Sequence, residues 1–245
     1  MSVATLSSTS GRILRQLRHD HRTIAMMLVV PGVLLTFVYF MYVDNELLFD
    51  RIALIMLGIF PFIIMFLVTS IAMLRERTSG TLERLFTTPV AKADLLFGYG
   101  IAFGLAATLQ ATIATLLATW VLGLDTAGNV GFVVLIAVTN ALLGVSLGLL
   151  FSAFAQTEFQ AVQFMPVVAI PQILLCGLFV PRDQMAGLLE AISNVLPLSY
   201  AVEALQEVGA NAEATATMWR DLAVVVGVVL LALVLGAATL RRRTP

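Results

Sequence analysis

The side chains with the clearest chemical pattern lie in one charged segment, Arg75–Asp94, which reads RERTSGTLERLFTTPVAKAD. Ser79-Gly80 stands where a helix N-cap is favoured, and Glu83 falls in the first turn, where a carboxylate suits the helix dipole. Thr88-Pro89 ends the pattern, because the residue before a proline leaves the helical region. The segment therefore predicts a short helix over residues 79–88.

The predicted helix has one apolar face, because Leu82, Leu85 and Phe86 recur at three- and four-residue spacing. An apolar face that leaves the membrane usually has a protein partner, so the chemistry expected here is docking. The alternative is a charged loop that water simply solvates.

Few other residues could do chemistry. His19 and His21 flank Asp20, but no HExxH or similar metal-ligand spacing follows, and Cys176 is the only cysteine. A phosphate-binding loop needs a lysine, and the only lysine, Lys92, has no such pattern around it. We therefore predict no catalytic residue, no metal site and no nucleotide site in this chain.

The composition indicates the elements that must position the charged segment. Hydrophobic residues make up 60% of the 245 residues and charged residues only 12%, against about 25% charged in soluble proteins. Six windows contain no Asp, Glu, Lys or Arg: Thr23–Val43, Ile52–Leu74, Leu95–Leu124, Thr126–Thr157, Phe159–Pro181 and Leu222–Leu240. A spanning helix needs roughly 20 apolar residues, so each window predicts one span.

The sequence thus predicts an all-α integral membrane protein with one transmembrane domain, residues 1–245. The expected spans are residues 24–43, 52–74, 95–122, 130–155, 164–181 and 222–240. Of the fourteen Lys and Arg residues, eleven fall in the two tails and the loops after the second and fourth spans. By the positive-inside rule, both termini and the charged segment lie in the cytoplasm.

The N-terminal tail contains a second amphipathic pattern. After a Ser/Thr-rich start that we expect to be disordered, residues 11–22 place Ile13, Leu14 and Leu17 on one side and arginines around the rest. This pattern predicts a helix in the cytoplasmic membrane interface. A cleaved signal peptide is disfavoured, since the apolar run is long and no small-residue cleavage site follows it.

Glycine spacing predicts where two spans approach closely. Gly100 and Gly104 lie in the third span, and Gly144 and Gly148 lie in the fourth. Pairs of small residues four positions apart allow neighbouring helices to pack tightly in a membrane.

The region after the fifth span breaks the simple pattern. Apolar residues recur at helical spacing from Met185 to Ile192, Pro197 interrupts them, and Tyr200–Val208 resumes a helix. Each helix is too short to cross a bilayer. Together they predict a re-entrant hairpin, residues 183–209, on the outer side.

At this point the chain resembles the membrane subunits of type-2 ABC exporters, especially small bacterial drug-resistance permeases. The charged segment is similar to the family block E-x-x-x-G-T-L-E-x-L-x-x-T-P, matched by Glu76, Gly80, Thr81, Leu82, Glu83, Leu85, Thr88 and Pro89. The block LLCGLFVPRDQMAGLLEAISNVLPLSYAVEAL is similar to the family's fifth span and outer helices, with Gly177, Pro181, Pro197 and Tyr200 in step. Ala186 departs from the family pattern, where a proline is common.

The resemblance implies a six-span exporter bundle with an N-terminal interfacial helix, a cytoplasmic coupling helix and an outer re-entrant hairpin. The chain would be half of a homodimer or heterodimer in the cytoplasmic membrane, without a nucleic-acid partner. A separate ABC ATPase would bind ATP and Mg, and this chain would bind no cofactor. The residues expected to couple it to the ATPase are Gly80, Thr81, Leu82, Glu83, Arg84, Leu85 and Phe86.

The resemblance also implies a substrate cavity between the two copies, lined by the second and fifth spans. The residues expected in its wall are Phe62, Phe66, Phe164, Gln172 and Leu175. Pro181, Pro197 and Tyr200 would form an outer gate. Such a lining suits a hydrophobic or amphipathic substrate that is drug-like or lipid-like.

Two other functions fit parts of the pattern. An ABC exporter of lipid-linked glycan would share the whole architecture. An ion-coupled secondary transporter usually buries an ionisable residue in a span, and none of the six windows contains one.

Overall fold

The computed structural model describes residues 3–79 and 92–239, which form helices and connecting turns without a strand in those ranges. The helices are α1 (Val3–His19), α2 (His21–Met41), α3 (Glu46–Thr78), α5 (Lys92–Leu116), α6 (Val130–Phe151), α7 (Glu158–Leu175), α8 (Gly187–Ser193), α9 (Pro197–Ala210) and α10 (Ala216–Thr239). A π-helical turn, η1 (Leu117–Val121), continues α5, and a 3₁₀ turn, η2 (Arg182–Gln184), precedes α8.

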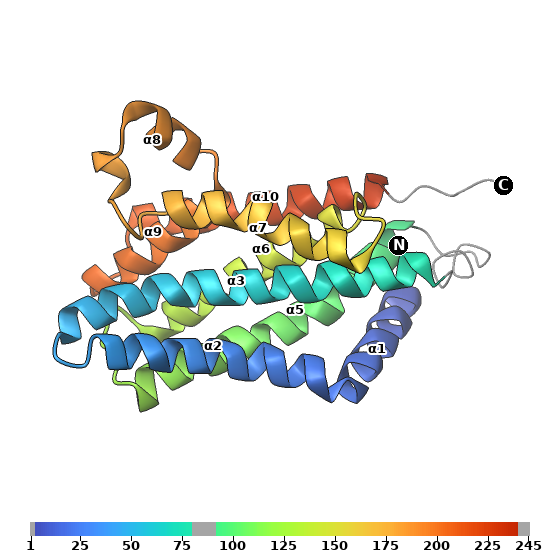
Figure 1. Ribbon diagram of the computed structural model, residues 1–245, viewed down its shortest axis with the longest axis horizontal. Helices are drawn as coiled ribbons and strands as arrows, with labels where there is room; N and C mark the ends of the chain where they lie inside the picture. The colour runs from blue at the N-terminus through green and yellow to red at the C-terminus, as the bar shows by residue number, and fades with distance from the viewer. Residues whose placement is uncertain (1–2, 80–91, 240–245) are drawn as a thin grey trace.

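Six of the described helices are long and apolar enough to cross a membrane, namely α2, α3, α5 with η1, α6, α7 and α10. The all-α membrane architecture expected from the sequence is therefore confirmed. Figure 1 shows these helices running side by side along the long axis of the molecule.

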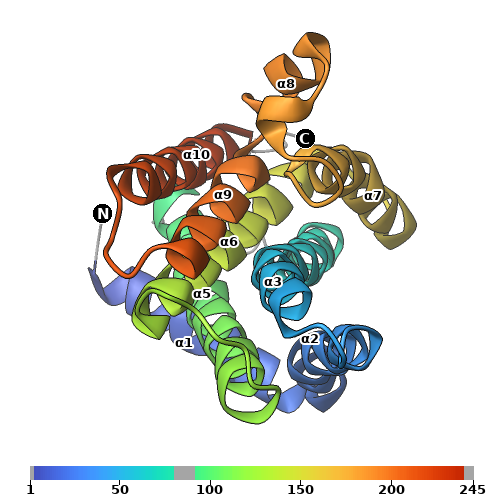
Figure 2. The same cartoon turned by 90° about the vertical axis from the view of Figure 1, so that its left-hand side faces the viewer.

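The two central helices of the bundle are α3 and α6, which make the most extensive contact with each other. Figure 2 shows α6 surrounded by α3, α5, α9 and α10, with α2 and α7 farther out. A Cβ atom at Gly144 would meet the backbone of Phe62, and one at Gly148 would meet the backbone of Phe66. The close approach predicted from these glycines is confirmed for α6, and its partner is α3.

Local capping groups, rather than charge-free windows, set the ends of α7 and α10. The Thr157 side chain accepts a hydrogen bond from the Gln160 N–H, so α7 begins at Glu158, and Gly177 follows its end with a φ of +96°. The fifth span expected over residues 164–181 therefore lies six residues earlier in the chain. Thr215 caps α10 in the same way, through the Met218 N–H.

The N-terminal segment differs from the expectation. The start of the chain was expected to be disordered, but helix α1 begins at Val3 and continues to His19. It packs on α5, where the buried Ser10 hydroxyl donates to the Gly98 carbonyl at 2.9 Å. Tertiary packing thus overrides the weak helix propensity of the Ser/Thr-rich start. The helix expected over residues 11–22 breaks at Asp20, which caps α2.

The chain between α7 and α10 forms two helices joined at a sharp angle. Helices α8 and α9 are bent by 88° relative to each other. Buried side chains from Leu198 to Val208 pack α9 against α3, α6 and α10, whereas α8 projects from the bundle (Figure 1). The re-entrant position of this pair in a bilayer stays a prediction.

The bundle has two distinct ends along its long axis. The start of α1, the end of α3 and the end of α10 lie at one end, which we call the termini end (Figure 1). Helices α8 and α9 lie toward the other, which we call the α8–α9 end. Helix α3 has 33 residues and is therefore about 50 Å long. This exceeds a hydrocarbon core of about 30 Å, so α3 connects the two ends and extends beyond the span expected over residues 52–74.

Candidate functional site

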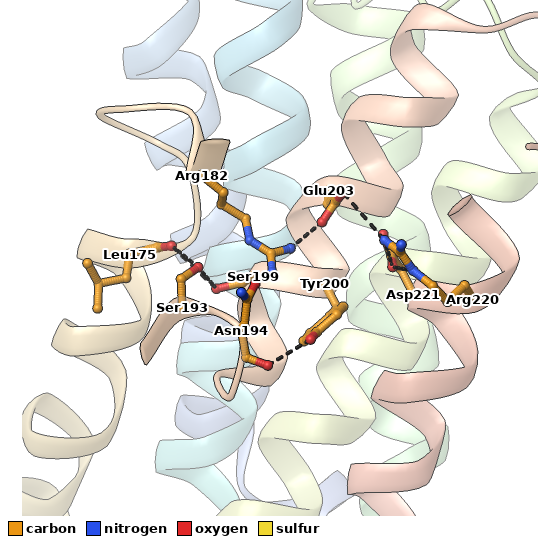
Figure 3. Close-up of polar contacts among 9 residues, drawn as sticks. All are labelled: Leu175, Arg182, Ser193, Asn194, Ser199, Tyr200, Glu203, Arg220 and Asp221. Atoms are coloured by element: carbon orange, nitrogen blue, oxygen red, sulfur yellow. Dashed lines mark hydrogen bonds and ion pairs between the residues drawn. The ribbon is translucent and has the colours of Figure 1, made fainter. Parts of the chain in front are cut away.

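A cluster of charged and polar side chains lies at the α8–α9 end, centred on Arg182. One guanidinium nitrogen of Arg182 donates to Glu203 Oε2 on α9, and another donates to Asn194 Oδ1 after α8. The guanidinium also lies over the Tyr200 ring, 4.9 Å from its centroid. Figure 3 shows these side chains converging from η2, the α8–α9 turn and α9.

The cluster continues onto α10 through a second arginine. Arg220 contacts Glu203 Oε1 at 3.5 Å and Asp221 Oδ1 at 2.7 Å. Arg182 and Arg220 balance the charges of the Glu203 and Asp221 carboxylates. The Asp221 side chain is completely buried. We call these six residues the Arg182 cluster: Arg182, Asn194, Tyr200, Glu203, Arg220 and Asp221.

Backbone and hydroxyl contacts hold the α8–α9 turn against α7 beside this cluster. The Ser193 hydroxyl donates to the Leu175 carbonyl at 2.8 Å, and it also contacts the Ser199 hydroxyl at 3.1 Å. The Tyr200 hydroxyl donates to the Asn194 carbonyl at 2.7 Å. These contacts, drawn in Figure 3, fix the position of α8 relative to α9.

A pocket of about 560 Å³ opens beside the Arg182 cluster. Of the residues expected at the outer gate, Pro181 and Tyr200 line this pocket. Pro197 does not line it. Instead Pro197 occupies the first position of α9, where its missing N–H costs no hydrogen bond. The wall of the pocket contains charged groups of both signs, so it can bind polar groups of a ligand. Separation of its ion pairs would also widen the pocket.

The sequence did not identify the charged members of this cluster as a site. The expected last span began at Leu222, which left Arg220 and Asp221 outside it. Helix α10 in fact begins at Ala216, so Arg220 and Asp221 lie in its first two turns, just before the charge-free window that begins at Leu222. The sequence does show opposite charges within a semi-apolar region. That pattern does not indicate which of these charged residues lie close together in the fold.

The residues expected in the cavity wall occupy three different environments. Phe62 and Phe66 are 0% and 1% exposed and are packed against α6 within this chain. Gln172 is also buried, and its Oε1 accepts from the Leu198 N–H at 3.2 Å, which joins α7 to the start of α9. Phe164 and Leu175 are half-buried, and Phe164 contacts Phe151.

The residues expected to couple to an ATPase, Gly80 to Phe86, lie outside the described residues. The described chain beside them contains a second polar group at the termini end. Arg12 on α1 contacts Glu76 Oε1 on α3 at 3.1 Å and donates to the Tyr99 hydroxyl on α5 at 2.7 Å. We call these three residues the Glu76 network. Sequence reasoning matched Glu76 to a family block but did not identify its partners.

Burial and charge act in opposite directions on Arg12. Burial alone would lower the pKa of Arg12, but the neighbouring Tyr99 and Glu76 outweigh it and hold that pKa above its ordinary value. Arg12 therefore stays positively charged and compensates the charge of Glu76, which is 6% exposed. The network joins three helices that are far apart in the sequence.

Two smaller polar contacts lie near the Glu76 network. Arg75 makes two hydrogen bonds to the Glu158 carboxylate, at 2.7 and 3.1 Å, which join the end of α3 to the start of α7. Asp20 accepts hydrogen bonds from the Thr23 hydroxyl and N–H, which hold the pKa of Asp20 below its ordinary value.

Among the described residues, no group of three or more His, Cys, Asp or Glu side chains could hold a metal ion. His19 and His21 lie at the junction of α1 and α2, where their ring nitrogens contact nearby backbone carbonyls.

Comparison with known proteins identifies relatives over most of the chain. The family model described as ABC-2 type transporter matches residues 4–208. The probable multidrug ABC transporter permease YbhR of Escherichia coli strain K12 is 28% identical over 156 residues, covering 64% of this chain and 42% of YbhR.

Two further relatives have similar identity. The linearmycin resistance permease protein LnrN of Bacillus subtilis strain 168 is 28% identical over 138 residues, 56% of this chain and 36% of LnrN. ABC transporter G family member 20 of Dictyostelium discoideum is 28% identical over 141 residues, 58% of this chain and 19% of that protein. The matched regions thus cover less than half of each relative. Since the family model covers 205 of the 245 residues, from the start of α1 into the last turn of α9, the chain belongs to the ABC-2 type transporter family.

Proposed function

We propose that the chain is the membrane permease subunit of an ATP-driven exporter, powered by a separate ABC ATPase. The observation that carries this proposal is the continuity of α3. It runs from the α8–α9 end to Thr78, directly before the segment expected to couple to the ATPase. A force on that segment acts on a continuous helix that reaches the opposite end of the bundle.

The Glu76 network explains how a local push would move several helices together. Glu76 lies two residues before the end of α3, and Tyr99 lies within two turns of the start of α5. The expected coupling helix connects these two helices along the chain. Because Arg12 binds both side chains, α1, α3 and α5 would move as one unit.

The Arg182 cluster would then act as the gate at the other end. Helix α9 packs on α3, and Glu203 on α9 holds Arg182 beside the pocket. A shift of α3 relative to α10 would pull Glu203 away from Arg182 or from Arg220. Separation of these ion pairs would open the pocket and release substrate.

We further propose that a second permease copy covers the peripheral helices α2 and α7. Their most apolar windows are only 17% buried, against 67% for α3 and α6. Val167, Ile170 and Leu174 are exposed along α7, and Val33 and Phe37 are exposed along α2. These residues replace Phe62 and Phe66 as candidates for the cavity wall, and they suit a hydrophobic or amphipathic drug-like or lipid-like substrate.

The test is to reconstitute the chain with its ATPase in vesicles and to measure efflux and ATP hydrolysis together. Glu83→Lys and Leu82→Asp should leave membrane insertion intact but abolish substrate-dependent ATP hydrolysis. Leu47→Asp is a matched control, because Leu47 is 85% exposed at the opposite end of α3. Full transport by both coupling variants would contradict the proposal.

A second candidate function is ion-coupled transport, which one observation favours. Asp221 is fully buried within α10, and among the described residues its Oδ2 has no hydrogen-bond partner. Buried carboxylates in spans commonly carry protons or ions. Inhibition of efflux by vanadate but not by an ionophore would support the ATPase-driven function, and the reverse pattern would support the ion-coupled one.

A further inference from the structure

A second cavity, of about 410 Å³, opens between α1, α2, α3 and α5 at the termini end. We call it the lateral groove. Its volume lies in the range of about 300 to 1,000 Å³ that ligand pockets occupy. Each helix contributes residues from a single face, such as Ile64, Val68 and Ile71 on α3. The groove lies within one chain, away from the Arg182 cluster and its pocket.

The lateral groove is polar at one end and apolar along its length. Asp20, Thr23, Arg75 and Glu76 line it at the junction of α1 and α2 and the last turns of α3. Met26 and Val30 on α2 and Ile64 and Val68 on α3 form apolar walls. The rise from Arg75 to Ile64 along α3 is about 16 Å, so the groove matches a molecule with a polar head and an apolar tail.

The charges at the polar end are not equally available to a ligand. The Arg75 guanidinium already makes two hydrogen bonds to Glu158. Asp20, in contrast, accepts hydrogen bonds from Thr23 and from the Arg22 backbone, and Arg75 attracts it, but it makes no salt bridge with any described residue. Glu76 Oε2 has no hydrogen-bond partner within the described part of the chain. The polar end therefore offers one carboxylate oxygen without a partner, Glu76 Oε2, and one carboxylate without a salt bridge, Asp20, while Arg75 is paired with Glu158.

We infer that the lateral groove binds an amphiphile with a protonated amine headgroup and an apolar chain that enters from the bilayer. A primary ammonium group has three donors and no acceptor, which complements Asp20 at the rim and Glu76 behind it. The apolar chain would lie against Val30, Ile64 and Val68. A carboxylate headgroup would be repelled, and an alcohol would make only neutral hydrogen bonds. This inference is independent of the proposed function, because it concerns binding by this chain without an ATPase.

The test uses the full chain in nanodiscs of phosphatidylcholine, a lipid without a primary amine. The probe is a twelve-carbon primary alkylamine with a photoreactive diazirine in mid-chain, compared with the matched alcohol and the matched carboxylate. Labelled peptides are quantified by mass spectrometry. We expect the amine to label the peptides that contain Val30 and Val68 about tenfold more than the alcohol, the factor for one charge-assisted hydrogen bond. The carboxylate should label them least.

Two pairs of variants test separately whether binding depends on the charge of Asp20 and on the shape of the lateral groove. Asp20→Asn keeps a good N-cap residue but removes the charge, so the preference for the amine should fall severalfold. Its matched control, Glu190→Gln, removes a carboxylate at the α8–α9 end and should change nothing. Val30→Trp should fill the groove and abolish labelling, whereas Val29→Trp, at a 57% exposed neighbouring position, should not.

The outcomes decide between binding and its absence. Equal labelling by all three probes, an unchanged amine preference in Asp20→Asn, or labelling confined to the exposed face of α7 would each overturn the inference. If Val30→Trp fails to fold, as judged by size-exclusion chromatography, Asp20→Asn still decides. Addition of phosphatidylethanolamine identifies the source of the ligand. If phosphatidylethanolamine reduces labelling by the amine probe, the ligand is an aminophospholipid. If labelling by the amine probe is unchanged, the ligand is a single-chain amine. Both results support the site.

Discussion

The two polar groups at opposite ends of the bundle are built on different sequence ranges. The Arg182 cluster is local, since Arg182 is 12 residues from Asn194 and 21 from Glu203. The Glu76 network is long-range, since Arg12 is 64 residues from Glu76 and 87 from Tyr99. The Arg182 cluster can therefore separate while the bundle stays folded. The Glu76 network holds together helices that no short stretch of chain connects.

Solvent exposure distinguishes the Arg220 end of the Arg182 cluster from the Glu76 network, although Arg182 is 15% exposed and Asp221 is fully buried. The Arg182 cluster borders a pocket of about 560 Å³, and the Arg220 side chain is 59% exposed. The Glu76 side chain is only 8% exposed. It forms a salt bridge with Arg12, which also donates a hydrogen bond to the Tyr99 hydroxyl. An exposed ion pair contributes little to stability, whereas removal of one partner from a buried pair leaves an uncompensated charge. We therefore expect the termini end to be the structural anchor and the α8–α9 end to be the movable part.

The largest effect should come from Glu76→Ala. The change leaves the half-buried Arg12 without a carboxylate and separates α1 from α3, so the free energy of unfolding should fall by about 2 kcal/mol. Thermal unfolding in detergent, followed by size-exclusion chromatography, measures the loss. Glu76→Gln keeps an acceptor for Arg12 and should lose less. If Glu76→Ala unfolds at the same temperature as the unchanged chain, the termini end is not an anchor.

Arg182→Ala should have an intermediate and localised effect. The Arg182 side chain is 15% exposed and contacts three members of its cluster, so its loss should free α8 from α9. We expect faster hydrogen exchange in residues 182–196 and a global destabilisation below about 1 kcal/mol.

Arg220→Ala serves as the comparison for that result, because the Arg220 side chain is much more exposed. It should accelerate exchange less than Arg182→Ala does. A uniform increase in exchange across α3 and α6 in either variant would show that the α8–α9 end is part of the anchor.

The smallest effect should come from Asp20→Ala, which removes a short-range contact at the termini end. Loss of the N-cap of α2 should cost about 0.5 kcal/mol at neutral pH, the low end of the range for such caps. Because Thr23 lowers the pKa of folded Asp20, this stabilisation is present above the ordinary carboxyl pKa and is lost as the pH falls through the folded value.

The difference in melting temperature between Asp20→Ala and the unchanged chain should therefore shrink below about pH 4. Asp20→Asn, which keeps the cap, should show a smaller difference at neutral pH. If Asp20→Ala lowers the melting temperature as much as Glu76→Ala does, the sequence separation of the contacting residues does not explain the order of these effects.

The sequence predicted much of the architecture because its signals are local. Charge-free windows located six spans, and Gly144 and Gly148 identified a close helix contact. The π-helical turn after Leu116 had no such signal, and neither did the early start of α7, which depends on the Thr157 cap.

The candidate sites were predictable only in part. Pro181 and Tyr200 line a pocket, whereas Pro197 does not. Phe62 and Phe66, which were expected in a cavity wall, are buried against α6, since rotation about a helix axis depends on which neighbour packs where. Their burial follows from the backbone of α3 resting on two glycines of α6.

By itself, the sequence determined that the chain is a bundle of apolar helices with its charges confined to the helix ends, because charge in a bilayer is costly wherever the helix lies. Only the tertiary structure decided which charges meet. Arg12 finds Glu76 and Tyr99, and Arg182 finds Glu203, because helix packing brings their side chains together. Pairing of this kind depends on the relative rotation and offset of whole helices, which no local pattern of residues specifies.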